Sequence, residues 1–307
     1  MIKIDVCPGT LANGFSHYSP SCIKYLFDGV NVSHILDFDY SSNGNDFINS
    51  INRISISGVQ EKISAVISKK KIIITPEGCH GRYIIKPAPN YKHLRFREFI
   101  PANEHLTMQI ASQVYKIKTA ENGIIFFRNG EMAYITKRFD YDKDGNKIMQ
   151  EDFSSIAGKT NRTHGKDFKY SGSYEDAARL IRNNVAAWQI EMDRFFSLMI
   201  FNYIFANGDA HLKNFSLQQT PNGDYIMTPA YDLINTSLHI NDGDFALQDG
   251  LIPTEEYSEI YSNSSHPCKE DFITFGNRIG VLPKKMNAIA CSAYALRNIY
   301  LCVHILE

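Results

Sequence analysis

Asn207-Gly208-Asp209-Ala210-His211-Leu212-Lys213-Asn214 is the most informative stretch of this chain. It places an Asn five positions after Asp209, and a further carboxylate, Asp232, follows downstream. The residues between Asn214 and Asp232 predict a β-hairpin, with its turn at Pro221-Asn222-Gly223-Asp224. That hairpin would return Asp232 beside Asn214. Because Mg²⁺ binds a few hard oxygen atoms completed by water and phosphate, the pattern indicates phosphoryl transfer.

The spacing of Asp209 and Asn214 matches the catalytic loop of protein kinases. In that loop the Asp accepts the proton of the substrate hydroxyl and the Asn binds Mg²⁺. A second interpretation stays open, because Asn and Asp favour turns. A short Asn-Gly-Asp run can simply end a helix. Features upstream of the loop favour the first interpretation.

The first upstream feature is the loop at residues 54–62, which reads Ile-Ser-Ile-Ser-Gly-Val-Gln-Glu-Lys and precedes a strand-like alternation at 63–67. Backbone N–H groups in such a loop can bind a triphosphate, although the single glycine, Gly58, makes the motif weak by itself. The second feature is Lys86, near the end of an apolar strand predicted at 82–87. Kinases place there a lysine that contacts the α- and β-phosphates. The alternative is a lysine that is only solvated.

A helix is predicted to follow Lys86. Pro101-Ala102-Asn103 precedes a run that is apolar at helical spacing, and Asn103 is predicted to cap this helix. Glu104 would then lie in the first turn. There it could complement the helix dipole, pair with Lys86 as the corresponding Glu does in kinases, or do both.

The pattern is β-rich up to about residue 140 and helical from Glu175 onward. Two strands are predicted at 123–127 and 132–140, joined by a hairpin turn that contains Asn129-Gly130. These features predict a small β-rich part followed by a mainly helical one.

The apolar segment 195–205 is too short to span a membrane, so it predicts a core helix that leads to Asp209. Residues 161–173 are polar and contain glycine, which predicts a mobile loop near the substrate entrance.

Composition narrows the function classes. The 307 residues carry a net charge of −1 and no basic block, so no direct nucleic acid binding is expected and any DNA contact would come through a partner. The six cysteines show neither C-x-x-C nor zinc spacing and are interpreted as reduced. The first residues lack the long apolar region of a signal peptide. A cytoplasmic location without membrane association is therefore predicted.

In combination, these residues resemble the HipA family of bacterial serine/threonine kinases, the toxins of type II toxin–antitoxin modules. The matching motifs are Ser55–Lys62, Ile85-Lys86, Asn103-Glu104, Arg138–Asp140, Gln150–Phe153, Gly208–Phe215 and Pro229–Asp232. The resemblance implies an α+β, two-lobed, protein-kinase-like fold. Residues 1–138 would form a smaller β-rich N-lobe, and residues 139–307 a mainly α-helical C-lobe.

The resemblance also implies roles for individual residues. The nucleotide-binding set would be Lys86, Glu104, Lys137, Phe139, His211, Gly58 and Val59, with the backbone near Lys137 and Phe139 holding the adenine. Asp209 would be the catalytic base, and Asn214 and Asp232 would bind Mg²⁺. His211 would lie near the ribose or phosphates, although a lone His is often a hydrogen-bonded structural residue. Gln150 lies in a matched motif without an assigned chemistry.

Two serines in the 54–62 loop add a regulatory expectation. Ser55 aligns with the serine that HipA-like kinases autophosphorylate, and Ser57 completes a Ser-Ile-Ser pattern that resembles the short HipT kinases. A phosphate there adds about two negative charges beside the ATP phosphates, so it should act as a brake. The alternative is that both serines are ordinary small loop residues.

The resemblance predicts an ATP-dependent kinase that phosphorylates a protein serine, with an aminoacyl-tRNA synthetase as the implied target. Only some fifty residues precede the loop, whereas HipA proteins carry an additional N-terminal subdomain. This resembles HipT of the three-part HipBST systems, so the implied partners are a small HipS-like protein and a HipB-like DNA-binding antitoxin. A small-molecule kinase and an inactive nucleotide-binding subunit of an antitoxin complex remain alternatives.

Overall fold

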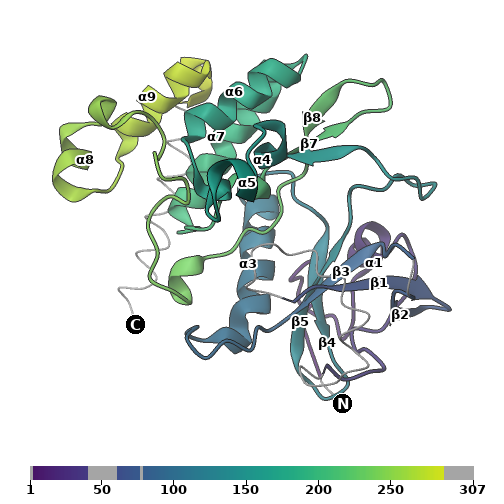
Figure 1. Cartoon of the computed structure of the whole chain (residues 1–307). Coiled ribbons are helices and arrows are strands. Elements are labelled where there is room, and N and C mark those ends of the chain that lie inside the picture. The colour runs from purple at the N-terminus through teal and green to yellow at the C-terminus, as the bar shows by residue number, and fades with distance from the viewer. Residues whose placement is uncertain (1–2, 41–60, 77–78, 287–307) are drawn as a thin grey trace. The chain divides into compact units, whose positions relative to one another are not determined.

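The computed structural model describes residues 3–40, 61–76 and 79–286. The predicted Ser55, Ser57, Gly58 and Val59 therefore lie outside the described residues. The chain divides into two compact units, which are described separately below (Figure 1). Unit 1 comprises residues 1–114, 119–144 and 238–240, and unit 2 comprises residues 115–118, 145–237 and 241–307.

Unit 1 contains a five-stranded antiparallel sheet in the order β2-β1-β3-β5-β4 (Figure 1). The strands are β1 (Ile63–Ser68), β2 (Lys71–Ile74), β3 (Tyr83–Pro87), β4 (Asn122–Phe126) and β5 (Met132–Lys137). The predicted strands and the hairpin between β4 and β5 are confirmed, except that β5 ends at Lys137 rather than at residue 140.

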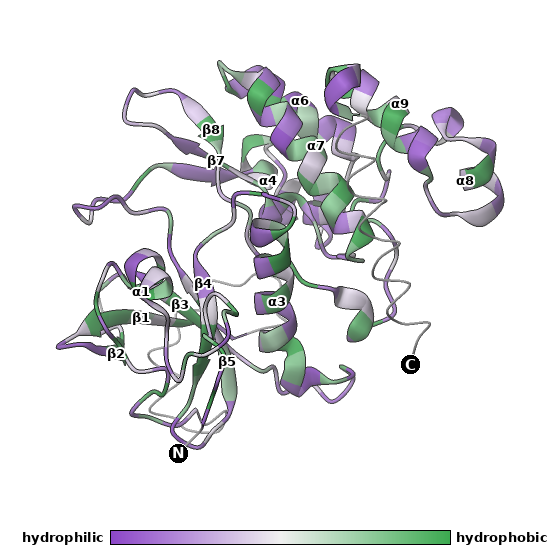
Figure 2. Cartoon of the chain, turned by 180° about the vertical axis from the view of Figure 1, so that it is seen from behind, coloured by the Kyte–Doolittle hydropathy of each residue, from purple (hydrophilic) through white to green (hydrophobic). Residues whose placement is uncertain are grey.

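Alternation along β3 gives the sheet two different faces. Ile85 lies opposite Ile63 of β1 and Ile135 of β5, and all three side chains are fully buried. This apolar face packs against the N-terminal segment that carries helix α1 (Pro20–Leu26). Figure 2 shows the apolar residues of β1 and β5 in green. The next residue, Lys86, points to the opposite face because side chains alternate along a strand.

Helix α3 (Ile100–Gln113) covers that opposite face. Its start contradicts the prediction, because Asn103 does not cap it. The 3-10 turn η1 (Arg97–Phe99) leads directly into α3, and Pro101 fits the first turn, where its missing N–H would have no helical partner. Glu104 consequently lies in the second turn.

Asn103 has a different role, because it anchors the segment 238–240 within unit 1. The backbone N–H of Arg95 donates to the His239 carbonyl at 3.0 Å. The Nδ1 atom of His239 faces the Arg95 carbonyl at 2.8 Å, so that nitrogen must carry the ring proton. The other ring nitrogen then accepts a hydrogen bond from the Asn103 amide at 2.8 Å.

Unit 2 is mainly helical, with one three-stranded antiparallel sheet in the order β6-β7-β8. The helices are α4 (Phe153–Ile156), α5 (Asn161–His164), α6 (Tyr174–Asn184), α7 (Trp188–Ile204), α8 (Glu259–Ser264) and α9 (Lys269–Ile279). The strands are β6 (Gln150–Asp152), β7 (Ser216–Gln219) and β8 (Tyr225–Met227), and the short 3-10 turns are η2 (Phe168–Tyr170), η3 (Leu212–Asn214), η4 (Thr236–Leu238) and η5 (Thr254–Glu256). The predicted core helix and the β7–β8 hairpin are confirmed.

The predicted loop at residues 161–173 is folded. It contains α5 and the turn η2, and Phe168 and Lys169 are buried. Thr160 starts α5 with a reciprocal side-chain cap with Thr163. The segment thus contains short helical turns, and its mobility near a substrate entrance stays a prediction.

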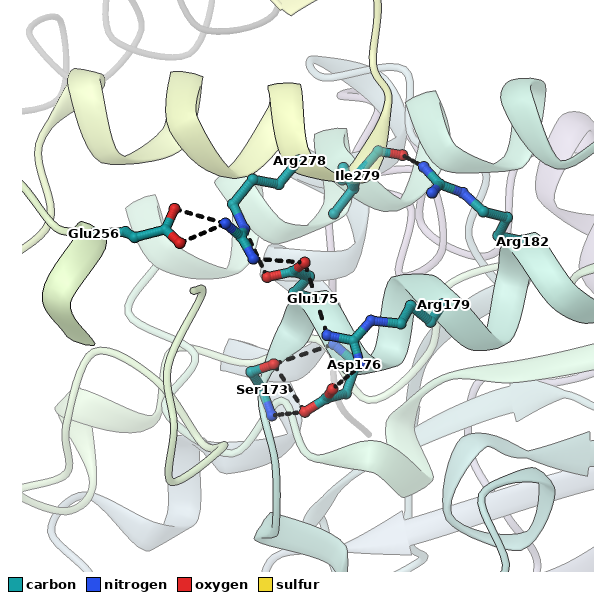
Figure 3. A network of polar contacts seen from close by, with 8 residues as sticks. All are labelled: Ser173, Glu175, Asp176, Arg179, Arg182, Glu256, Arg278 and Ile279. Atoms are coloured by element: carbon teal, nitrogen blue, oxygen red, sulfur yellow. Dashed lines mark hydrogen bonds and ion pairs between the residues drawn. The ribbon is translucent and has the colours of Figure 1, made fainter. Parts of the chain in front are cut away.

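A charged network joins α6 to α9 (Figure 3). Ser173 and Asp176 cap the N-terminus of α6 reciprocally. Arg278 of α9 binds two carboxylates, Glu175 of α6 and Glu256, with N–O distances of 2.6–3.0 Å. This network holds α9 at the start of α6.

The α+β fold class is therefore confirmed. None of the helices in the described part of the chain has the length and apolar character that a membrane span requires.

Candidate active site

In unit 1, the predicted site residues Lys86 and Glu104 form a buried ion pair. The Lys86 ammonium donates to Glu104 Oε1 at 2.5 Å, and the two side chains are 4% and 3% exposed. Tyr134 lies opposite Lys86 in the sheet register, so its ring reaches the same face, 5.2 Å from the ammonium. Sheet register and helix position together bring the Lys and the Glu into contact.

Such a pair needs to be hydrogen-bonded, because removing charged groups from water is costly. The short contact and the aromatic ring partly offset that cost. A lysine held in this way is a fixed positive charge, which is suited to a phosphate group. Glu104 is too far along α3 to complement the first turn, so pairing is the interpretation that remains.

The predicted adenine-binding residues lie at the end of β5. The Lys137 ammonium donates to Asp28 Oδ1 at 2.5 Å. The backbone N–H of Lys137 donates to the Glu121 carbonyl at 2.9 Å. That N–H is therefore occupied within unit 1. Phe139 follows in a bend directly after the strand and is half-buried.

In unit 2, the end of α7 leads into a loop that is held at several points. The Asn207 side chain donates to the Asn202 side chain at 2.9 Å. The Gly208 N–H donates to Thr236 Oγ1 at 2.8 Å, and that hydroxyl donates to the Ala206 carbonyl at 3.0 Å. These bonds fix the backbone on the N-terminal side of Asp209.

Two further contacts restrict the same loop. Tyr174 of α6 donates from its hydroxyl to the Ala210 carbonyl at 2.9 Å. Gly208 packs so closely on residues 242–243 that an added Cβ would lie 2.6 Å from the Gly243 carbonyl oxygen and would also clash with the Asp242 carboxylate. Only glycine fits there without displacing the loop.

The Asp209 side chain is 46% exposed, and its Oδ1 atom is held by neighbouring side chains. The Tyr170 hydroxyl donates to this oxygen at 2.9 Å. His211 Nε2 lies 3.9 Å from the same atom, and the Tyr170 and His211 rings pack edge to face with centroids 5.3 Å apart. One carboxylate oxygen is thus held by the protein, while the side chain stays accessible.

His211 is a buried ring beside Asp209. Burial lowers the pKa of His211, although the charges of Asp209 and Asp232 oppose this effect. His211 is therefore predominantly neutral at pH 7.

The other two predicted residues are also held by local structure. Asn214 ends the turn η3 and donates its N–H to the His211 carbonyl at 2.9 Å. Tyr231 bonds through its hydroxyl to Ser216 at 2.7 Å and to the Lys213 carbonyl at 2.8 Å. The following residue, Asp232, has a φ of 56°, an uncommon backbone conformation for a non-glycine residue.

One carboxylate and one amide oxygen are hard ligands of the type that Mg²⁺ prefers. The residues thus fit a magnesium ion that completes its shell with water and phosphate. In the described ranges, no group of three or more His, Cys, Asp or Glu side chains could hold a metal by itself. Two protein donors suit a metal that is also coordinated by the phosphate oxygens of a substrate.

Sequence reasoning missed several of these supports. They are Tyr170, Tyr174, Thr236 and Asp242. Tyr170 lies 39 residues before Asp209, and no local pattern indicates their contact. Tyr231 was part of a matched motif, but its role in anchoring the segment before Asp232 was not predicted.

Gln150 lies in β6, opposite Gln218 of β7, and still has no assigned chemistry. Its neighbour Asp152 has a structural role, since it accepts from the Ser155 N–H at 2.9 Å as the cap of α4. Asp152 also lies 3.7 Å from the ammonium of Lys213, which belongs to the same loop as Asp209.

Comparison of sequences gives two informative relatives. A Haemophilus influenzae protein with a provisional kinase name is 28% identical over 285 residues, covering 87% of this chain and 79% of that protein. The serine/threonine-protein kinase toxin HipA of Shewanella oneidensis is 27% identical over 230 residues, covering 68% of this chain and 49% of HipA. The chain thus spans about half the length of that toxin.

The solved complex of Shewanella oneidensis HipA with HipB and operator DNA contains a chain of similar fold. Its TM-score is 0.59 at 21% identity, covering 83% of this chain and 59% of that chain. The model of the HipA-like C-terminal domain matches residues 54–297. That match includes every predicted catalytic and metal-binding residue, and the chain belongs to the family of HipA-like C-terminal domains, a kinase family.

Proposed function

We propose that this chain is an ATP-dependent protein serine/threonine kinase that transfers the γ-phosphate of ATP to a protein serine. One observation carries the proposal: the Asp209 carboxylate is 46% exposed in a loop that Tyr170, Tyr174 and Thr236 hold by hydrogen bonds. The buried Lys86–Glu104 pair in unit 1 supports it, since kinases use such a pair to bind ATP phosphates.

The proposed reaction assigns one task to each group. Asp209 accepts the proton of the acceptor serine, whose oxygen forms a bond to the terminal phosphorus of ATP while the bond to the β-phosphate oxygen breaks and ADP leaves. Lys86 binds the phosphates as a fixed positive charge. Asn214 and Asp232 would hold Mg²⁺, which neutralises phosphate charge when bound. Neutral His211 can donate a hydrogen bond but adds no charge.

Two variants separate these tasks. Asp232→Asn removes a charged metal ligand, so it should weaken Mg·ATP binding in a nucleotide titration. Asp209→Asn should keep ATP affinity and lose phosphate transfer. Equal losses of ATP affinity in both variants would contradict the assignment.

The proposal includes autophosphorylation of Ser55 or Ser57 as a brake. Their Ser-Ile-Ser pattern resembles the HipT branch. Added phosphate would repel the ATP phosphates at short range. Mass spectrometry of the loop peptide should find phosphate in active protein and none in Asp209→Asn. An active enzyme with an unmodified loop would refute the brake.

By resemblance, the proposed target is an aminoacyl-tRNA synthetase, whose phosphorylation would halt tRNA charging. Phosphoproteomics of cells that briefly express the chain, with Asp209→Asn as the control, tests activity and target together. Phosphosites that appear equally in both samples would not be products of this enzyme.

The proposed partners are a HipB-like DNA-binding antitoxin and a small HipS-like protein. The solved HipA relative is bound to HipB and operator DNA. Purification from the native operon at physiological expression should recover the partners with the kinase. Recovery of the kinase alone would count against a three-part assembly.

Two other functions compete with this proposal. A small-molecule kinase would share the Asp and Asn but would turn over ATP without phosphorylating any protein. An inactive nucleotide-binding subunit would not turn over ATP at all. An ATPase and phosphotransfer assay with whole-cell protein as acceptor distinguishes all three.

A further inference from the structure

The turn η2 (Phe168–Tyr170) supplies a side chain to the proposed catalytic base, although the sequence between α5 and α6 looked like a polar loop. Tyr170 is the residue concerned. Its hydroxyl donates to Asp209 Oδ1 at 2.9 Å, and its ring packs edge to face on His211 with centroids 5.3 Å apart. The two contacts set both the position and the direction of the hydroxyl.

The hydrogen bond from Tyr170 makes the two carboxylate oxygens of Asp209 inequivalent. Oδ1 receives the Tyr170 hydrogen bond and is the oxygen nearest to His211, at 3.9 Å. A carboxylate can rotate about its Cβ–Cγ bond, and the hydrogen bond to Oδ1 favours one orientation. Because the side chain is 46% exposed, Oδ2 is left as the oxygen that can meet an acceptor hydroxyl.

Burial and the charge of Asp209 raise the pKa of the Tyr170 hydroxyl above its usual range. The phenol consequently stays protonated and keeps its role as a donor. Lys169, the preceding residue, is buried with its ammonium 4.7 Å from the Tyr170 ring. The Tyr170 ring thus has contacts with both Lys169 and His211, which restrict its movement.

We propose that Tyr170 is a positioning residue, which holds Oδ1 of Asp209 so that Oδ2 accepts the proton of the substrate serine. This inference rests on the proposed kinase function. It assigns Tyr170 no contact with ATP or with the transferred phosphate. Loss of its hydroxyl should therefore affect the rate of transfer and leave nucleotide binding unchanged.

The test is Tyr170→Phe, which keeps the ring on His211 and removes only the hydroxyl. The kcat for phosphorylation of a protein acceptor should fall about tenfold or more, since a hydrogen bond to a charged group is worth a factor of this order. KM for ATP and the affinity measured by nucleotide titration should stay within about twofold of wild type.

Tyr203→Phe is the matched control. Tyr203 is another part-buried tyrosine of unit 2, and its hydroxyl donates to the Pro267 carbonyl at 2.8 Å. Removing it should lower the thermal unfolding midpoint without changing kcat. An equal fall of kcat in both variants would mean that a general loosening of the unit, and not positioning, causes the effect.

A double-mutant cycle on thermal stability tests the contact without using activity. Tyr170→Phe and Asp209→Ala should be non-additive, because each removes the same hydrogen bond. Additive effects, or a Tyr170→Phe enzyme with wild-type kcat, would overturn the positioning role alone. Wild-type protein that transfers no phosphate would overturn the proposed function and the positioning role with it.

Discussion

Lys86, which pairs with Glu104, affects both the stability of the fold and the proposed binding of phosphate, and experiments can separate the two effects. The Lys86 ammonium is almost fully removed from water and is hydrogen-bonded to the Glu104 carboxylate, 18 residues further along the chain. Removing one member of a buried ion pair leaves the other charge buried without its main partner, which costs more than the intact pair contributes. Stability and phosphate binding should therefore respond differently to substitution.

Glu104→Leu should destabilise the protein by about 3–5 kcal/mol, because it removes the carboxylate that pairs with the buried Lys86 ammonium. The double variant Lys86→Met/Glu104→Leu should recover much of this stability but should not bind ATP. Urea unfolding and nucleotide titration measure the two effects. Asp37→Asn, which removes an exposed pair with Lys71, should change the urea midpoint little. A double variant no more stable than Glu104→Leu would contradict this account.

At the scale of elements, the loop after α7 is fixed by close packing as much as by hydrogen bonds. Gly208→Ala should lower stability by about 1–3 kcal/mol, because the added methyl group meets the Gly243 backbone and the Asp242 side chain. It should also remove phosphate transfer by displacing Asp209. Gly243→Ala is the control, since its added Cβ would lie 3.9 Å from the nearest atom. If both variants behave alike, close packing is not what fixes the loop.

Local patterns predicted the elements well where neighbours in sequence determine them. The β4–β5 and β7–β8 hairpins have turn residues and alternation that act over a few positions. The start of α3 was mispredicted because Asn103 is a good cap in isolation, whereas η1 and Pro101 start the helix earlier. The Asn103 side chain is then available for a long-range contact, its hydrogen bond with His239.

The sequence predicted only those site residues that are close to one another along the chain. Spacing within one loop indicated Asp209 and Asn214, and the hairpin indicated the return of Asp232. The tyrosines that hold this loop come from η2 and α6, which precede it by more than 30 residues. Their contacts depend on how unit 2 packs, and no periodicity encodes that packing.

At the scale of the whole molecule, a buried histidine should make stability depend on pH. Burial lowers the pKa of His105 from 6.5 to about 4, against the opposing effect of its hydrogen bond with Asn122. Between these values the unfolded chain binds a proton that the folded chain does not. Stability is thus full above pH 6.5 and is lost as the pH falls toward 4.

The loss from His105 should reach about 2 kcal/mol at pH 5. His105→Gln keeps a donor toward Asn122 and removes the titration, so the difference in urea midpoint between pH 7 and pH 5 should shrink. His164→Gln, at an exposed position, should leave that difference unchanged. An undiminished pH dependence in His105→Gln would show that other groups cause it.

Because residues 238–240 belong to unit 1, neither proteolysis nor truncation separates the two units cleanly. The chain leaves unit 1 after residue 114, returns at 119, leaves again after 144 and comes back at 238–240, where His239 is bonded to Arg95 and Asn103. Neither unit is a continuous stretch of sequence. After a single protease cut at residue 144, the C-terminal fragment would still carry residues 238–240 of unit 1. A gene truncated there would encode a unit 1 without its last three residues. Exchange of either part between relatives by one recombination crossover would likewise break an intact unit.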